Sequence, residues 1–152
     1  MTMTEARPLI RAVREGDRAD WTRLWAGYLD FYRTSLPQGA YDSLFARLLA
    51  PGADGPFGLL AEVNGRPAGL VHFLFHAHCW RPEGAVYLQD LFTDPAARGR
   101  GVGRALIEAV YAAADAAGRP YVYWLTQSGN STARVLYDRI GAATDFIRYV
   151  RQ

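Results

Sequence analysis

The stretch that decides the fold is Arg98-Gly99-Arg100-Gly101-Val102-Gly103-Arg104, a basic glycine loop. Residues 86–93, before it, are apolar, aromatic and β-branched and end at Asp94-Pro95, which predicts a strand running into a turn. Apolar residues then recur at helical spacing from residue 102 until Gly118. A helix N-terminus offers free backbone N–H groups and the positive end of a helix dipole. The loop is therefore predicted to bind an anion.

The glycine spacing separates this loop from two other phosphate-binding motifs. No Lys-Ser or Lys-Thr pair follows Gly103, as a nucleoside-triphosphate loop requires. The dinucleotide fingerprint also fails, because its last glycine would fall on Arg104 or Leu106. The pattern that remains, Arg98-x-x-Gly101-x-Gly103, resembles the coenzyme A pyrophosphate loop of the GNAT superfamily of N-acetyltransferases.

A second stretch, residues 130–141, extends the resemblance. Asn130 opens a predicted helix and Tyr137 follows on its second turn, as in that family. The order of strands and helices over residues 84–150 is also similar. The resemblance implies one domain over residues 1–152, with an α/β (α+β) fold in which about four helices flank a mixed central sheet of about six or seven strands. Within the superfamily, the chain looks most similar to the branch of histone and polyamine acetyltransferases.

Composition limits the alternatives. The 152 residues, 50% of them hydrophobic, suffice for one core, and no run approaches the ~20 apolar residues of a membrane span. Without the apolar core of a signal peptide near the N-terminus, we expect a cytoplasmic protein with no membrane partner. All 17 basic residues are arginines interspersed with acids at a net charge of +2, so no nucleic-acid partner is expected. Cys79 is the sole cysteine and reads as a strand residue rather than an acyl-carrying nucleophile.

The rest of the chain divides into recognisable elements. An aromatic stripe of residues 21, 24, 25, 28 and 32 predicts a helix after Asp17 that ends near Pro37, and it is interpreted either as core or as a border of the acceptor site. Asn64-Gly65 predicts a hairpin. Strands are predicted at residues 9–14, 57–63, 66–79, 121–126 and 145–151, helices at 41–49 and 130–140, and a turn at 80–84.

The resemblance assigns acetyl-CoA as the cofactor and no metal. The backbone of residues 98–104 would hold the pyrophosphate, and the arginines would add positive charge, with the adenosine 3′-phosphate as a second target. The main chain of residues 91–93 would lie along the pantetheine arm. Asn130 would both cap its helix and bind the pantetheine amide. The predicted cofactor-binding residues are Leu91, Phe92, Thr93, Arg98, Gly99, Arg100, Gly101, Val102, Gly103, Arg104 and Asn130.

Tyr137 is expected to act as the general acid that returns a proton to the departing thiolate. A phenol with a pKa near ~10 protonates a thiolate whose conjugate acid has a pKa near ~8.5 only when the two are held close. From its helical stripe alone, Tyr137 would be an ordinary core residue. A backbone amide near Phe92 is expected to stabilise the oxyanion.

Removal of the amine proton needs a base, because an amine with a pKa near ~10 is only ~0.1% neutral at pH 7. Asp90 is the first candidate and Glu62 the second. His72, His76 and His78 share one face of a predicted strand, but ~13 Å separates the first two at extended spacing, too far to ligate one ion. They are interpreted either as a polar outer face or as part of the acceptor pocket.

Two functional classes follow. The first is an N-acetyltransferase that moves an acetyl group directly, in a ternary complex, to a primary amine of a small molecule or protein. The second is a non-catalytic coenzyme A-binding module, against which Tyr137 and Asn130 argue. The aromatic residues at 121–124 and 146–149 are interpreted as a homodimer interface, frequent in the family, or as core.

Overall fold

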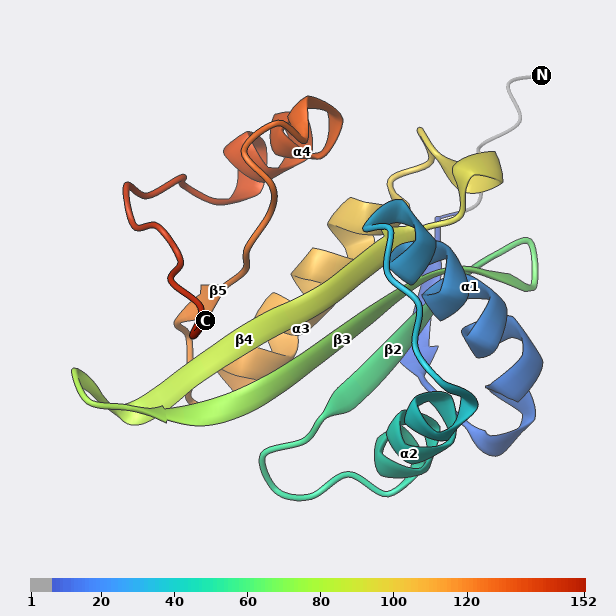
Figure 1. Cartoon of the computed structure of the whole chain (residues 1–152), viewed down its shortest axis with the longest axis horizontal. Coiled ribbons are helices and arrows are strands. Elements are labelled where there is room, and N and C mark those ends of the chain that lie inside the picture. The colour runs from blue at the N-terminus through green and yellow to red at the C-terminus, as the bar shows by residue number, and fades with distance from the viewer. Residues whose placement is uncertain (1–6) are drawn as a thin grey trace.

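A computed structural model of the chain describes residues 7–152 and contains one mixed sheet (Figure 1). Its strand order follows the sequence, with antiparallel pairing from the first strand to the fourth and parallel pairing of the fourth with the fifth. The strands are β1 (Leu9–Ala12), β2 (Phe57–Val63), β3 (Arg66–His78), β4 (Arg81–Thr93) and β5 (Val122–Tyr123). The predicted α/β class is confirmed, with five strands where six or seven were expected.

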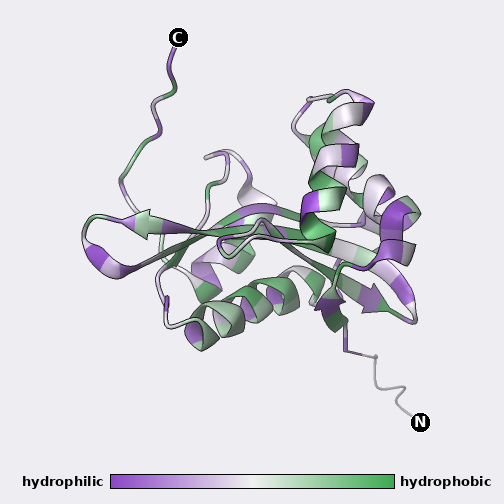
Figure 2. Ribbon diagram, turned by 90° about the horizontal axis from the view of Figure 1, so that it is seen from below, coloured by the Kyte–Doolittle hydropathy of each residue, from purple (hydrophilic) through white to green (hydrophobic). Residues whose placement is uncertain are grey.

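Four helices cover the two faces of the sheet (Figure 2). They are α1 (Arg18–Phe31), α2 (Gln38–Leu49), α3 (Val102–Ala116) and α4 (Ser131–Ile140), with short 3-10 turns η1 (Glu15–Asp17) and η2 (Pro95–Ala97). Helices α1 and α2 bury an aromatic core around Trp21 and Phe45 against one face. Helix α3 buries Leu106 and Val110 against the other, and α4 joins that side through Leu136. No helix within residues 7–152 is long and apolar enough to cross a membrane.

The long antiparallel hairpins follow from local sequence. Asn64 and Gly65 both take positive φ angles, 52° and 77°, as the predicted two-residue turn between β2 and β3 requires. The predicted turn at residues 80–84 is shorter than expected, since β4 already begins at Arg81. β3 and β4 therefore form a long ribbon that extends beyond the helices (Figure 1).

The prediction of a final strand at residues 145–151 is wrong for this structure. These residues pair with no strand, and Phe146, Ile147, Tyr149 and Val150 are between 69% and 88% exposed. The strand predicted at residues 121–126 shrinks to β5, whose ladder with β4 holds only two residue pairs. Aromatic and β-branched residues form a strand only where a sheet edge satisfies their backbone, and β5 offers too short an edge.

Candidate active site

Strands β4 and β5 separate in the middle of the sheet. Their pairing stops at Tyr87 and Tyr123, whereas β4 continues to Thr93. In the ladder between β3 and β4, His72 pairs with Asp90 and Phe73 pairs with Leu88. Gln89 of β4 therefore has no partner residue in β3 and forms a bulge. Such a bulge bends a strand and increases its twist. The last part of β4 thus presents, on the side of β5, backbone groups that no strand of the described chain takes up.

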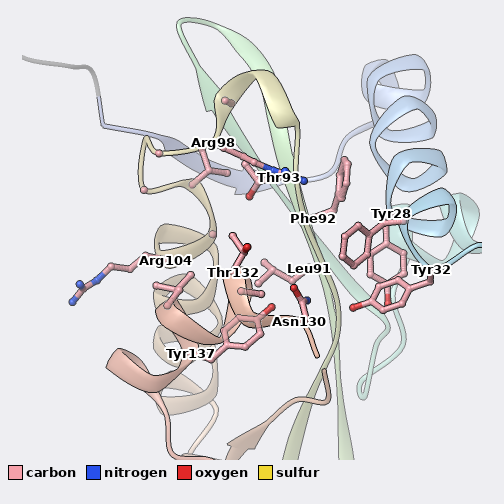
Figure 3. Close-up of a pocket in the computed structure, with 18 residues that line it drawn as sticks. Tyr28, Tyr32, Leu91, Phe92, Thr93, Arg98, Arg104, Asn130, Thr132 and Tyr137 are labelled. Atoms are coloured by element: carbon pink, nitrogen blue, oxygen red, sulfur yellow. The ribbon is translucent and has the colours of Figure 1, made fainter. Parts of the chain in front are cut away.

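A cavity of about 450 Å³ lies at this opening (Figure 3). It is bounded by the end of β4, the loop that leads into α3, the C-terminal end of α1 and the start of α4. All the predicted cofactor-binding residues except Arg100 line it, and Arg100 lines a smaller neighbouring cavity. The lining residues are Tyr28, Phe31, Tyr32, Leu91, Phe92, Thr93, Ala97, Arg98, Gly99, Gly101, Val102, Gly103, Arg104, Asn130, Thr132, Ala133, Leu136 and Tyr137.

The glycine loop leaves the N-terminus of α3 open toward the cavity. Gly101 precedes the helix in the left-handed conformation, with φ at 75°, and no side chain caps the helix. A Cβ on Gly99 or Gly101 would meet no atom within 4 Å, so the space before the helix is free. Uncapped N–H groups and the helix dipole favour an anion there, and the loop fits a diphosphate.

Tyr137 reaches the cavity from α4, and Figure 3 shows its hydroxyl directed toward the end of β4. The ring contacts Trp124 edge-on, with centroids 5.6 Å apart. Burial, and to a lesser degree the neighbouring Tyr32, raises the pKa of Tyr137 to about 12. The phenol therefore stays protonated at neutral pH and can donate a hydrogen bond or a proton.

The comparison with known proteins agrees with this geometry. Residues 21–142 match the Acetyltransferase (GNAT) family. The chain belongs to this family. It is 37% identical over 151 residues to the D-amino-acid N-acetyltransferase HPA3 of Saccharomyces cerevisiae, covering 98% of this chain and 93% of the relative. GNAT enzymes transfer acetyl groups from acetyl-CoA to amines, so the protein is an acetyl-CoA-dependent acetyltransferase.

Solved GNAT structures share the fold. The ribosomal-protein-alanine N-acetyltransferase of Brucella melitensis biovar Abortus 2308 superposes with a TM-score of 0.78 at 23% identity, over 97% of this chain and 99% of that one. AAC(6')-Iy in complex with a bisubstrate analogue of CoA reaches 0.82 at 18% identity, with the same coverage. The likeness to the histone and polyamine branch stays a prediction, since the yeast relative is named for D-amino acids.

Two of the predicted cofactor-binding residues have side-chain partners of their own, and the predicted helix cap by the Asn130 side chain is wrong. Asn130 occupies the N-cap position of α4, but its side chain makes no cap hydrogen bond and instead donates to the Thr126 hydroxyl at 3.3 Å. Its amide is thus turned along the loop while the residue still lines the cavity. Arg104 lines the cavity too, but its guanidinium pairs with Glu108 one turn along α3, at 2.8 Å.

Asp90, the first candidate base, lies behind the cavity lining rather than in it. Only 7% exposed, it accepts hydrogen bonds at Oδ2 from His72 Nδ1 (2.8 Å) and Trp25 Nε1 (3.2 Å). Glu62, the second candidate, accepts a hydrogen bond from Arg11 at 2.8 Å, and it does not line the cavity either.

The three histidines do not act as a set. His72 is only 3% exposed and accepts a hydrogen bond from Trp21 at 3.0 Å, so its assignment to a polar outer face is wrong. The reason is tertiary: α1 and α2 cover that part of β3. His76 instead hydrogen-bonds Tyr123 at 2.7 Å, and neither it nor His78 lines the cavity. Within residues 7–152, no three His, Cys, Asp or Glu side chains gather as a metal would require.

The aromatic stripe that starts in α1 divides between the core and the cavity. Trp21 and Trp25 are buried in the core, whereas Tyr28 and Tyr32 line the cavity opposite Tyr137 (Figure 3). Close approach of α1 to β4 depends on Gly27, where a Cβ would lie 2.7 Å from the Phe92 ring. The site residues that the sequence did not single out are Phe31, Ala97, Thr132, Ala133 and Leu136.

Proposed function

We propose that this GNAT enzyme acetylates the primary amine of a small molecule, with a free amino acid as the leading candidate, by direct transfer in a ternary complex. The observation that carries the proposal is the single cavity that joins the open N-terminus of α3 to the hydroxyl of Tyr137 along the unpaired edge of β4. A diphosphate at one end and an acyl thioester at the other match this arrangement.

Each part of the chain has a distinct role in the proposal. Acetyl-CoA supplies the activated acetyl group as a thioester. The N–H groups of residues 101–104 bind the diphosphate, and the unpaired backbone of residues 91–93 binds the pantetheine amides and the acetyl oxygen. Tyr137 donates its proton to the departing thiolate. Asp90 receives the proton of the attacking nitrogen.

The amino acid as acceptor rests on the relative of known substrate class. The yeast relative, which matches 98% of this chain at 37% identity, is named for D-amino acids.

The test is release of free thiol from acetyl-CoA in the presence of D-amino acids, L-amino acids, polyamines and a protein N-terminal peptide. We expect turnover with at least one class of amino acid. Tyr137→Phe should lower kcat by about 100-fold, as loss of a general acid does, and change the Kd for acetyl-CoA by less than about twofold. Tyr123→Phe, which removes a hydroxyl outside the cavity, is the matched control.

Two results would contradict the proposal. Equal loss of turnover and of cofactor affinity in Tyr137→Phe would make that residue structural. A rise in Tm with acetyl-CoA, together with no thiol release for any amine, would favour the non-catalytic coenzyme A-binding module instead.

A further inference from the structure

Four buried side chains between α1 and the sheet form one hydrogen-bonded chain that ends at Asp90, directly behind the cavity lining. Trp21 donates to His72, and His72 and Trp25 both donate to Asp90. Each is at most 7% exposed. Burying an imidazole and a carboxylate costs stability relative to apolar residues, and the neighbouring Leu70 shows that this face of β3 accepts leucine. Packing alone therefore does not account for the pair.

The direction of the hydrogen bonds follows from the donor inventory. An indole N–H can only donate, so the Nε2 atom of His72 must carry a lone pair. The imidazole is then neutral with its proton on Nδ1, the nitrogen that faces Asp90 at 2.8 Å. Trp21 thus selects the tautomer of His72, and His72 donates to the carboxylate.

Both donors meet the same carboxylate oxygen. His72 and Trp25 bond to Oδ2 of Asp90, and the Tyr28 hydroxyl, which lines the cavity, lies close enough to hydrogen-bond the same carboxylate. Oδ1, which neither the imidazole nor the indole takes up, is therefore left for that hydroxyl and for the acceptor. The charge of Asp90 helps to raise the pKa of Tyr28, after burial, which places the carboxylate next to a hydroxyl that lines the cavity.

We propose that His72 is a positioning residue that holds Asp90 with Oδ1 toward the acceptor amine. The inference rests on the proposed function and adds a residue to it. As the amine lone pair forms the C–N bond, positive charge develops on nitrogen, and a fixed carboxylate stabilises that charge and takes one N–H proton. The C–S bond breaks, and Tyr137 supplies the proton to the thiolate. Water then removes the proton from Asp90 and returns one to Tyr137.

The decisive experiment compares His72→Asn with His72→Gln. The two variants carry the same amide, but Asn places its N–H₂ near the position of Nδ1 and Gln near that of Nε2. Asn can therefore keep the donor to Asp90, whereas Gln keeps contact with Trp21 and loses that donor. We expect His72→Asn to retain kcat within about fivefold of the wild type and His72→Gln to lose about 30-fold, as for a hydrogen bond to a charged group. The Kd for acetyl-CoA should be unchanged in both.

Trp25→Phe tests the same inference independently, since it removes the second donor to Oδ2 and keeps an aromatic ring; we expect kcat to fall about 10-fold. The positioning role would be overturned if His72→Asn and His72→Gln lost kcat equally and in proportion to their losses in Tm. Turnover by the wild type would in that case leave the proposed function intact. A wild type without turnover would instead remove the proposed function and, with it, this inference.

Discussion

The Tyr111 hydroxyl donates a hydrogen bond to the main-chain oxygen of Ile140 at 2.7 Å. This bond ties the last turn of α4 to the middle of α3. Because α3 begins at the glycine loop and α4 carries Tyr137, the bond also fixes the position of Tyr137 relative to the glycine loop.

Tyr111→Phe should therefore loosen α4. We expect the free energy of unfolding to fall by about 1 kcal/mol, the net worth of one hydrogen bond, and the Kd for acetyl-CoA to rise several-fold. Urea denaturation and calorimetric titration measure the two effects. Tyr121→Phe is the control, since the Tyr121 ring packs on Arg81 and His78 of the β3–β4 ribbon. The same change in both variants would contradict the role of the bond.

Gly101→Ala should weaken cofactor binding. The left-handed φ of 75° costs an alanine about 1 kcal/mol, and the new methyl group occupies the space before α3. We expect both a lower Tm and a higher Kd for acetyl-CoA. Gly39→Ala, in α2, adds the same methyl group at an ordinary φ where a Cβ meets nothing, and should stabilise the protein slightly. Unchanged cofactor affinity in Gly101→Ala would argue against the anion site.

Asp17 should make stability depend on pH at the acidic end. Arg11 donates two hydrogen bonds to its carboxylate, at 2.7 and 2.8 Å, and thereby lowers the pKa of Asp17 from its usual 3.8. A lowered pKa in the folded state stabilises the protein above pH 3.8, and this contribution disappears as pH falls through the folded-state value.

Asp17→Asn should accordingly lower the free energy of unfolding at pH 7 by about 1–3 kcal/mol and reduce its slope below pH 4. Denaturation at several pH values provides the measurement. Asp42→Asn, which breaks an exposed ion pair with Arg18, should have little effect. If the free energy of unfolding of Asp17→Asn still depends on pH below pH 4 as in the wild type, that dependence comes from other carboxylates.

Tyr137 should affect the alkaline end with the opposite sign. Burial raises its pKa to about 12 in the folded state, against 10 in the unfolded chain. The folded state then holds a proton that the unfolded state has lost, so stability falls as pH rises from about 10 to 12. Tyr137→Phe should flatten this part of the curve. The kcat of the wild type should not decline near pH 10. A decline there that is absent in Tyr137→Phe would mean that the pKa of Tyr137 is well below 12.

The exposed C-terminal segment leads to a proposal about assembly. Four large apolar side chains at residues 146, 147, 149 and 150 are at least 69% exposed, which is costly for a monomer. We propose that residues 145–151 pair with a second copy of the chain. Light scattering should show a dimer that Ile147→Glu dissociates and that Leu49→Glu, at an exposed position of α2, does not. A wild-type monomer at micromolar concentration would refute this proposal.

Local signals account for the parts of the site that could be predicted. The backbone conformation of Gly101 and the hairpin at Asn64-Gly65 depend on residue types that tolerate positive φ, and the α3 stripe depends on spacing within a few turns. The same locality explains the errors. A segment rich in aromatic and β-branched residues, such as residues 145–151, forms a strand only if a partner edge exists, and that edge is not encoded within the segment.

Neighbouring residues are enough to specify the glycine loop before α3 and the helix after β5 that carries Tyr137. The surroundings of Asp90 and His72 depend instead on how the elements pack in three dimensions. Trp21 and His72 are 51 positions apart, and Trp25 and Asp90 are 65 apart. Their hydrogen bonds exist because Gly27 lets α1 settle onto β4, a contact between surfaces that no local pattern specifies.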